Sequence, residues 1–273
     1  MNTREAAAQL SPALAAAGIA DPAFEAELLV RMAAEVTRAA FFASPSLDCA
    51  ATARLEVALE RRLRREPAAY ISGAREFYGL AFEVRTGVLI PRPESELLVE
   101  IALRELAGTP GAMVMDVGTG SGCIATAIAR NAPGARVVAT DRSATALAIA
   151  RRNAGSHDAD VAFARCDLAA AIGTADIIVA NLPYIPSATI ETLEPEVRDW
   201  EPRSALDGGH DGLDLICRLI DDCATRLRPS LLALEVGSGQ AGRVAAIAIA
   251  AGARVEVVRD LAGIERVVCA QWR

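Results

Sequence analysis

The sequence contains no lysine, since all 28 of its basic side chains are arginines. Pyridoxal-phosphate enzymes and lysine-dependent aldolases react through a lysine Schiff base, so the composition excludes both classes. It also excludes a P-loop nucleotide site, in which a lysine reaches the nucleotide phosphates. Any catalytic site in this chain must therefore work without an ammonium group.

Histidine is nearly absent and cysteine is not clustered. The chain has 2 histidines, and none of its 6 cysteines belongs to a CxxC pair. Zinc sites and disulfide frameworks need closely spaced ligands or thiols, so we expect neither, and no metal. A long apolar run and a signal peptide are also missing, which predicts a cytoplasmic protein with no membrane partner.

Basic charge is in deficit, with 35 acidic residues and a net charge of −7. A broad basic surface, which tight duplex binding usually requires, is therefore not expected, and we predict no direct nucleic-acid substrate. One local cluster, the run Arg-Arg-Leu-Arg-Arg at 61–65, is a possible contact for an acidic or nucleic-acid partner. We interpret it instead as the solvated face of a helix.

Hydrophobic residues make up 52% of the 273 positions, enough for a sizeable core, and their spacing changes along the chain. Residues 1–70 repeat apolar positions at helical spacing and predict a small helical domain. Aromatic and β-branched residues around Gly79 predict a β-hairpin linker over residues 71–90. Residues 91–273 form a third region, in which strands and helices alternate.

The alternation predicts an α/β fold with a mostly parallel sheet covered on both faces. The expected helices are 97–106, 123–131, 144–153, 213–227 and 242–251. The expected strands are 113–117, 136–140, 161–164, 177–180, 231–236, 255–258 and 266–269. Only residues 259–265 separate the last two strands, too few for a parallel crossover, so we expect them to pair as an antiparallel hairpin.

Two glycine-rich loops follow strands and are candidates for binding a ligand through the backbone. Residues 237–242 match the dinucleotide pattern GxGxxG, and Asp260 lies where a ribose-binding acid is expected. The antiparallel hairpin that follows denies this loop the consecutive parallel strands that a dinucleotide half-site needs. We therefore interpret it as a tight turn from strand to helix.

The loop from Asp116 to Gly122 has the required strand–helix–strand context. Asp141 ends the next strand, where a carboxylate can accept hydrogen bonds from ribose hydroxyls, and Asp167 follows the strand after it, within reach of an adenine amine. Together these features predict an adenosine-containing ligand. NAD remains open at this point, because Gly120, Gly122 and Ala125 fit the relaxed dinucleotide pattern.

The turn Asn181-Leu182-Pro183-Tyr184 follows the fourth strand, at the edge where open α/β sheets bind ligands. The Asn181 carboxamide oxygen and the Leu182 carbonyl can accept both hydrogens of a planar NH2 group, and the Tyr184 ring can stack on it. This arrangement suits methylation of an amino group by positioning, without a dedicated base. The alternative is a turn used only for chain reversal.

His157 and His210 lie in polar loops, and we interpret both as surface residues.

This turn is similar to the Asn-Pro-Pro-Tyr signature of S-adenosyl-L-methionine-dependent amino-group methyltransferases, which act on adenine or glutamine. From about Tyr70 to its end, the chain resembles the HemK/PrmC family, whose members methylate the glutamine side-chain amide in the Gly-Gly-Gln motif of peptide chain release factors. The resemblance is carried by the motifs at 75–79, 89–96, 116–122, 200–202 with 205–206, and 208–209 with 211–213.

The resemblance implies a Rossmann-like class I methyltransferase domain over residues 91–273, with a seven-stranded sheet, and a substrate-recognition role for residues 1–70. It implies that S-adenosyl-L-methionine is the cofactor and S-adenosyl-L-homocysteine the product. The glutamine amide is then held by Asn181, Leu182, Pro183 and Tyr184. The implied cofactor-binding residues are Asp116, Gly118, Thr119, Gly120, Ser121, Gly122, Asp141, Asp167, Leu168 and Asn181.

The sequence departs from the family pattern at two positions. Leu182 stands where the family usually has proline, which restores a backbone N–H but keeps the carbonyl acceptor. Ser95 stands where threonine is usual and keeps the hydroxyl. The alternatives are methylation of adenine N6 or of a ribosomal-protein glutamine, and a weakly catalytic module that binds release factors. Residues 92–96 favour the release-factor branch, and we expect the protein to be a monomer.

Overall fold

The computed structural model describes residues 1–109 and 111–272 of the chain. They form two compact units. The first comprises Met1–Gly73 together with Glu194–Trp200, and the second comprises residues 74–193 and 201–272. Nothing in the sequence indicated that Glu194–Trp200, far downstream, packs with the helical unit rather than with its chain neighbours.

The first unit is helical, as the apolar spacing predicted. Two of its longer helices begin at polar caps. Asn2 accepts a hydrogen bond from the backbone N–H of Glu5, whose carboxylate accepts one from Asn2 in return, and Asp48 caps the helix that begins at Cys49. Its helices are α1 (Thr3–Ala16), α2 (Pro22–Ala34), α3 (Arg38–Phe42), α4 (Cys49–Leu63), α5 (Ala68–Ser72) and α9 (Pro195–Arg198).

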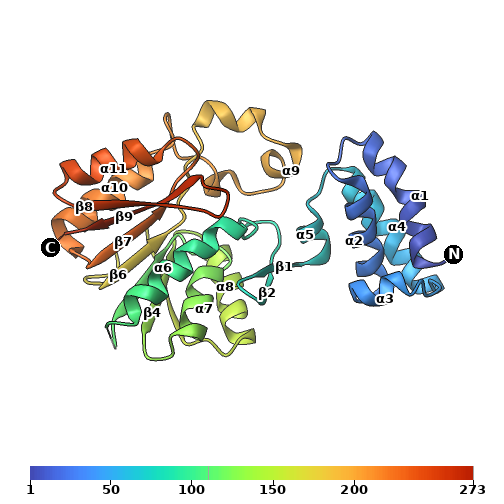
Figure 1. Cartoon of the computed structure of the whole chain (residues 1–273), viewed down its shortest axis with the longest axis horizontal. Coiled ribbons are helices and arrows are strands. Elements are labelled where there is room, and N and C mark those ends of the chain that lie inside the picture. The colour runs from blue at the N-terminus through green and yellow to red at the C-terminus, as the bar shows by residue number, and fades with distance from the viewer. Residues whose placement is uncertain (110, 273) are drawn as a thin grey trace. The chain divides into compact units, whose positions relative to one another are not determined.

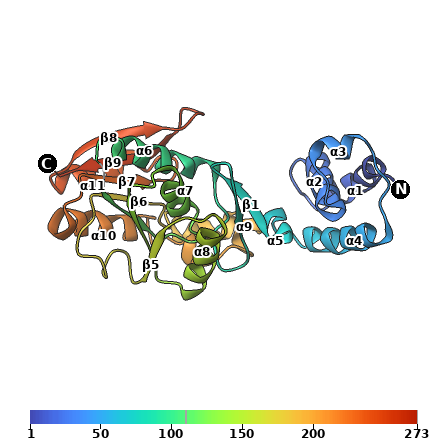
Figure 2. The ribbon, with the colours of Figure 1, turned by 90° about the horizontal axis from the view of Figure 1, so that it is seen from below.

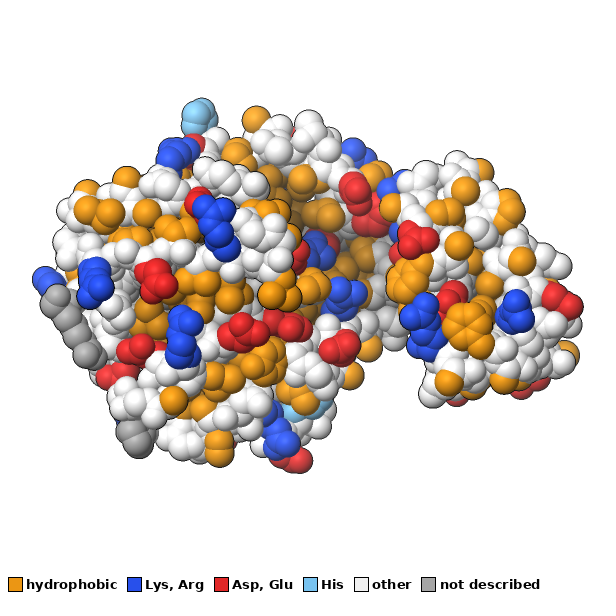
Figure 3. Space-filling view, viewed as in Figure 1, with side chains coloured by type: hydrophobic (Ala, Val, Ile, Leu, Met, Phe, Trp, Pro, Cys, Tyr) orange, Lys and Arg blue, Asp and Glu red, His pale blue; other side chains and the backbone are white. Residues whose placement is uncertain are grey.

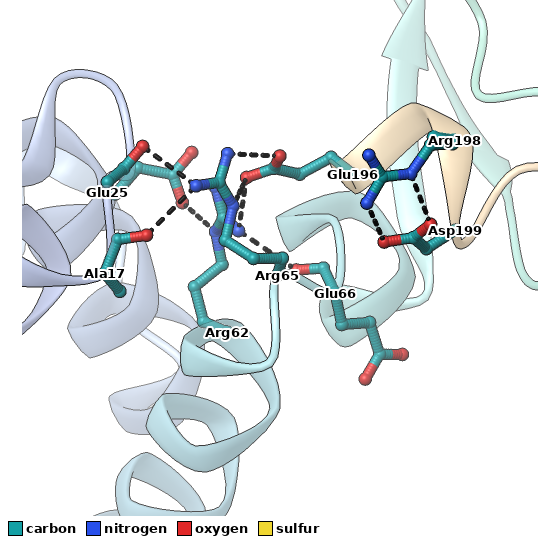
Figure 4. A network of polar contacts seen from close by, with 9 residues as sticks. Ala17, Glu25, Arg62, Arg65, Glu66, Glu196, Arg198 and Asp199 are labelled. Atoms are coloured by element: carbon teal, nitrogen blue, oxygen red, sulfur yellow. Dashed lines mark hydrogen bonds and ion pairs between the residues drawn. The ribbon is translucent and has the colours of Figure 1, made fainter. Parts of the chain in front are cut away.

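The arginine cluster at the end of α4 is not a solvated face, which corrects the interpretation from sequence. Arg62 is 4% exposed and binds the carboxylates of Glu25 and Glu196, each at 2.9 Å (Figure 4). Arg65 also binds Glu196, at 2.6 Å. Arg64, in contrast, is 70% exposed. The carboxylates that make burial of the Arg62 charge possible come from α2 and α9.

The second unit is built on a seven-stranded sheet and a separate hairpin. The hairpin pairs β1 (Ala74–Phe77) with β2 (Leu80–Glu83), which confirms the predicted turn at Gly79. The sheet strands are β3 (Met113–Val117), β4 (Arg136–Asp141), β5 (Val161–Arg165), β6 (Ile177–Ala180), β7 (Leu231–Glu235), β8 (Arg254–Arg259) and β9 (Glu265–Gln271).

The sheet order is β5-β4-β3-β6-β7-β9-β8, with β3 to β7 parallel and β9 antiparallel to both of its neighbours. The predicted antiparallel last hairpin is therefore confirmed, as is the mostly parallel sheet. The order reverses at β3, which has β4 on one side and β6 on the other. This reversal creates the crevice where open α/β sheets bind ligands.

Helices cover both faces of this sheet, and Figures 1 and 2 show α6 and α7 on the face opposite α10 and α11. Alternate residues of a strand point to opposite faces: Ile177 and Val179 pack on the α6 side, whereas Ile178 packs on the α10 side. The helical segments of the unit are η1 (Pro93–Ser95), α6 (Glu96–Leu106), α7 (Cys123–Asn131), α8 (Ala144–Ser156), η2 (Ser187–Thr192), η3 (Arg203–Ala205), α10 (Asp214–Asp222), the π-helical turn η4 (Cys223–Leu227) and α11 (Ala241–Ala250).

Across the described ranges of the chain, no helix has both the length and the apolar character needed to traverse a lipid bilayer.

Candidate active site

The loop between β3 and α7 is shaped by three glycines in the left-handed region. Gly118, Gly120 and Gly122 have φ angles of 75°, 56° and 80°. The N–H groups of Gly118 and its neighbour Thr119 both donate to the carbonyl of Thr140, at 2.9 Å, which ties the loop to β4. A Cβ on Gly122 would lie 2.8 Å from the Cβ of Ala150, so glycine is required there for α8 to approach the loop.

Asp116 is buried next to this loop and holds its shape. One carboxylate oxygen, Oδ2, accepts from the Thr119 hydroxyl at 2.6 Å and from the Ala125 N–H at 3.2 Å. The other oxygen, Oδ1, has no partner among the described residues. Burial raises the pKa of Asp116 to about 6. Asp116 therefore supports the loop and keeps one acceptor available.

Asp141 stands at the carboxyl end of β4 and binds the glycine loop. Its Oδ2 accepts from the Gly120 N–H at 3.0 Å, and its Oδ1 accepts from the Ser143 N–H at 2.8 Å. A carboxylate has about four lone-pair sites, so both oxygens can still accept from a ligand. Asp167, in contrast, is half-exposed and paired with Arg218.

One pocket, open to solvent at its mouth, collects most of the residues predicted from sequence. The predicted residues that line it are Gly118, Gly120, Asp141, Asp167, Leu168, Asn181, Leu182 and Pro183. A direct contact to a ligand stays a prediction for the remaining residues, which do not line it: Asp116, Thr119, Ser121, Gly122 and Tyr184.

The turn after β6 is packed closely against the glycine loop. Leu182 is 3% exposed, and a Cβ on Gly118 would lie 3.1 Å from its Cδ2. The leucine side chain belongs to the apolar core on the α10 side of the sheet, together with Leu213 and Ile216. This packing explains how a residue other than proline is accommodated at this position.

The glycines at 208 and 212 allow a second close approach. A Cβ on Gly208 would lie 2.7 Å from the carbonyl oxygen of Pro183, and one on Gly212 would overlap the carbonyl of Tyr184. The backbone N–H of Gly208 donates to the Ile185 carbonyl at 2.9 Å. Residues 208–212 therefore form a backbone support for the turn, which explains why glycine stands at 208 and 212.

The second glycine loop supports the same turn. Its Gln240 accepts from the Gly237 N–H at 2.8 Å and donates from Nε2 to the Tyr184 carbonyl at 2.8 Å. The chain then enters α11 at Ala241, as predicted for a tight turn from strand to helix. Burial raises the pKa of Tyr184 to about 12, so its phenol stays protonated at neutral pH.

Asn181 is held by a chain of two hydrogen bonds that begins at a buried carboxylate. The Ser95 hydroxyl donates to Glu235 Oε2 at 2.6 Å, and the Asn181 Nδ2 donates to the Ser95 Oγ at 2.9 Å. Ser95 is 2% exposed and Glu235 is 1% exposed. Burial raises the pKa of Glu235 to about 7, although the hydrogen bond from Ser95 acts to lower it.

A second buried acid, Glu201, is paired with Arg92. Glu201 is 5% exposed and accepts from the guanidinium at 2.6 Å, while burial raises its pKa. This ion pair joins two of the sequence motifs, residues 89–96 and 200–202, across 109 positions of the chain. Leu89 and Pro202, from the same two motifs, line the pocket.

Comparison with known proteins matches both parts of the chain. Residues 5–73 match the family described as PrmC N-terminal domain, and residues 93–193 match the methyltransferase small domain family. A release factor glutamine methyltransferase of Geobacter sulfurreducens is 41% identical over 93% of this chain and 91% of its own length. The corresponding protein of Caulobacter vibrioides is 40% identical over 92% and 90%.

The chain belongs to the family of release factor glutamine methyltransferases. These relatives confirm the HemK/PrmC resemblance drawn from the motifs. They also confirm the expectation of a methyltransferase enzyme.

Solved structures support the class I methyltransferase fold of this family member. The human METTL16 catalytic domain matches with a TM-score of 0.58, at 14% identity over 82% of each chain. RsmC of T. thermophilus, a 16S rRNA methyltransferase solved with AdoMet and guanosine, matches with a TM-score of 0.52, at 21% identity over 73% of this chain and 50% of its own.

The cofactor of this methyltransferase is S-adenosyl-L-methionine, and the pocket suits it. The glycine loop forms part of the pocket wall with its backbone, because Gly118 and Gly120, which both have left-handed backbone angles, line the cavity. Asp141 also lines the cavity, and its two carboxylate oxygens have lone pairs left that can accept hydrogen bonds from hydroxyl groups. The residues present therefore fit an adenosine-containing ligand.

Several supporting residues of this methyltransferase were not singled out from sequence. Glu235, Gln240 and Asn153 support the site through hydrogen bonds to residues far away in the chain. Glu235 carried one visible signal, because it is a charged residue in the otherwise apolar run 231–236. Of the two histidines, His210 is exposed as expected, whereas His157 is half-buried. The Nε2 of His157 lies 2.8 Å from the carbonyl oxygen of Ala81 in β2.

Proposed function

We propose that this chain transfers a methyl group from S-adenosyl-L-methionine to the side-chain amide nitrogen of the glutamine in the Gly-Gly-Gln motif of peptide chain release factors. The observation that carries the proposal is the position of the amide-binding turn. Asn181, Leu182 and Pro183 line the same pocket as Gly118 and Asp141. Acceptors suited to an NH2 group therefore stand beside residues suited to the methyl donor.

The cofactor supplies a methyl group on a positively charged sulfur, which is open to attack by nitrogen. In the overall reaction an N–CH3 bond forms, the S–CH3 bond breaks to leave S-adenosyl-L-homocysteine, and one amide proton passes to water. The chain holds the cofactor through the backbone of residues 118–122, with Asp141 at the ribose and Asp167 and Leu168 around the adenine. The lining of the pocket and the chemistry of each group support these assignments.

The substrate amide is held by its two hydrogens. Asn181 Oδ1 and the Leu182 carbonyl accept them, while the Tyr184 ring provides a flat surface for the amide plane. Accepting both hydrogens shifts electron density onto the nitrogen and directs its lone pair at the methyl group. Positioning of this kind needs neither a general base nor a lysine.

The mixed charges of the surface and the family of the first unit both favour a protein as the substrate. On the face drawn in Figure 3, arginine and acidic side chains are intermingled among the residues coloured by type. Such a surface suits a protein better than a nucleic-acid duplex. We assign recognition of the release factor to the helical unit, which matches the PrmC N-terminal domain family over residues 5–73.

Because release factors act in translation, we place the enzyme in the cytoplasm, and we propose that it works as a monomer.

The test uses full-length protein, cofactor labelled in the methyl group and a purified release factor. Label should enter the wild-type release factor and not a version whose Gly-Gly-Gln glutamine is replaced by alanine. Equal labelling of the two would contradict glutamine as the acceptor. Labelling of RNA or DNA but of neither release factor would favour adenine, and cofactor binding without any transfer would favour a binding module.

A further inference from the structure

The face of the sheet beneath α6 explains why three distant residues meet. Strands β6 and β7 run parallel in register, with Ala180 opposite Leu234. Asn181 and Glu235 are the next residues along the chain after this pair, so they continue the face of the sheet that packs against α6. Ser95 immediately precedes the first residue of that helix. The alternation of the two strands thus brings an amide and a carboxylate to the start of α6.

The Ser95 hydroxyl does not serve the helix that it precedes. A serine at the N-cap of a helix normally accepts a hydrogen bond from the N–H of the second or third helical residue, which stabilises the helix. Ser95 makes no such bond to α6, all of which the structure describes. Its hydroxyl is bound instead to Glu235 at 2.6 Å and to Asn181 at 2.9 Å. Ser95 has helical backbone angles and ends η1, which runs directly into α6, so its hydroxyl serves the two bonds inside the site and not the helix end.

The direction of these bonds is set by the carboxylate. An ionised carboxylate can only accept hydrogen bonds, and a hydroxyl has one proton to donate. Ser95 therefore donates to Glu235, and its oxygen is left to accept from the Nδ2 of Asn181. The two ends of an asparagine amide are nearly equal in shape, so a partner of fixed polarity is needed to tell them apart.

We propose that Ser95 and Glu235 are positioning residues that fix the orientation of the Asn181 amide, so that its oxygen and not its NH2 group faces the substrate. This inference rests on the proposed function of Asn181 as an acceptor for the glutamine NH2. An asparagine that turns over presents donors to donors and repels the substrate amide. Glu235, 140 positions from Ser95, thereby acts on the substrate without touching it.

The test measures three quantities for each variant: kcat for methylation of the release factor, the dissociation constant of S-adenosyl-L-methionine, and the melting temperature. Ser95→Ala is expected to lower kcat by about tenfold to a hundredfold, in line with the effect of small misplacements in active sites, and to leave cofactor affinity within about twofold. Ser95→Thr keeps the hydroxyl and should recover most of the rate. Glu235→Gln keeps the shape but can donate as well as accept, so its kcat should lie between those of wild type and Ser95→Ala.

Ser230→Ala is the matched control, because Ser230 donates to the Asp176 carbonyl at the opposite end of β7. It should keep the wild-type kcat. A double variant separates positioning from general damage: if Ser95 acts through Asn181, then Ser95→Ala adds no further loss of kcat to Asn181→Ala. Additive losses, or a Ser95→Ala enzyme with wild-type kcat, would overturn the inference.

A second readout does not depend on the reaction. The side-chain NH2 signal of Asn181, identified by NMR as the one missing in Asn181→Ala, should shift and exchange faster with water in Ser95→Ala. An unchanged signal would overturn the inference even if the rate falls. Should the wild-type enzyme fail to methylate the release factor, the proposed function fails, and this signal still decides whether the chain of hydrogen bonds orients Asn181.

Discussion

The amide of Asn181 donates a hydrogen bond to the hydroxyl oxygen of Ser95, at 2.9 Å and across 86 positions of the chain. This bond joins the turn after β6 to the start of α6. It engages the NH2 end of a residue that lines the pocket, so the amide oxygen is the end available to a ligand. Changes to this chain of hydrogen bonds should alter kcat and its dependence on pH. Changes to buried polar groups, here and elsewhere in the fold, should alter the free energy of unfolding.

Replacing Asn181 by alanine should impair turnover far more than cofactor binding. The change removes an acceptor that we assign to the substrate amide, whereas the glycine loop and Asp141 remain. We expect kcat to fall by about 10²–10³-fold, as for the loss of one oriented hydrogen bond at a reacting group. The dissociation constant of S-adenosyl-L-methionine, measured by calorimetry, should change far less. Equal losses in both quantities would contradict the role assigned to the amide.

The rate should rise with pH through the titration of Glu235. Burial raises the pKa of this group from 4.5 to about 7; the Ser95 hydrogen bond, Arg266 and Arg92 lower it, while Glu94 raises it. Below this pH, Glu235 is protonated and can donate to Ser95, so the polarity that orients Asn181 is lost. We expect kcat of the wild type to increase with pH and to level off above the pKa. In Glu235→Gln this increase should be absent, and an identical pH profile in both enzymes would refute the assignment.

The free energy of unfolding should also depend on the titration of Glu235, but it should fall as pH rises, whereas kcat should increase. The native pKa lies above the ordinary value of 4.5, so the native state keeps a proton that the unfolded state has released. The contribution of Glu235 to the free energy of unfolding therefore falls as pH rises from 4.5 to about 7. Relative to wild type, Glu235→Gln should gain stability across this window and nothing further above it. Thermal melts of both proteins over this pH range measure the difference, and a constant difference would count against a raised pKa.

Neighbouring arginines of the α4 cluster should differ sharply in their effect on stability. Arg62→Ala leaves the mostly buried Glu25 without its arginine, while Glu196 keeps Arg65, and breaking a buried pair of this kind typically costs about 3 kcal/mol. Arg64→Ala is the control, since Arg64 is 70% exposed and such a surface pair contributes about 0.5 kcal/mol. Urea unfolding followed by circular dichroism compares the two. Similar losses in both variants would show that Arg62 is no more important to folding than a solvated arginine.

Two buried threonines give a matched pair for the energetics of the methyltransferase unit. Thr126 is fully buried in α7 and its hydroxyl has no partner among the described residues, whereas the Thr140 hydroxyl donates to the Leu168 carbonyl at 2.9 Å. Thr126→Val should raise the free energy of unfolding by about 1 kcal/mol, and Thr140→Val should lower it by a similar amount. The melting temperatures should move in opposite directions by about 2–4 °C. A decrease for Thr126→Val would indicate that its hydroxyl is hydrogen-bonded.

The sequence by itself determined the parallel sheet, its antiparallel end and eight of the residues that line the pocket. These features are local: the apolar period defines β3 and α7, and the glycines define the loop between them. In a parallel α/β sheet the carboxyl ends of the strands meet at one edge, so Gly118, Asp141 and Asn181 converge once their strands are recognised.

Only the tertiary structure decided which polar groups meet across the chain. Ser95 and Glu235 are 140 positions apart, and Arg62 and Glu196 are 134 apart. Local patterning tells which face of a strand or helix is apolar, but not which distant polar side chain is opposed to it once the elements pack. For the same reason the arginine cluster suggested a solvated face, because the carboxylates that neutralise Arg62 lie on α2 and α9. Packing also decided which bonds Ser95 makes, since its hydroxyl binds Asn181 and Glu235 instead of capping its own helix.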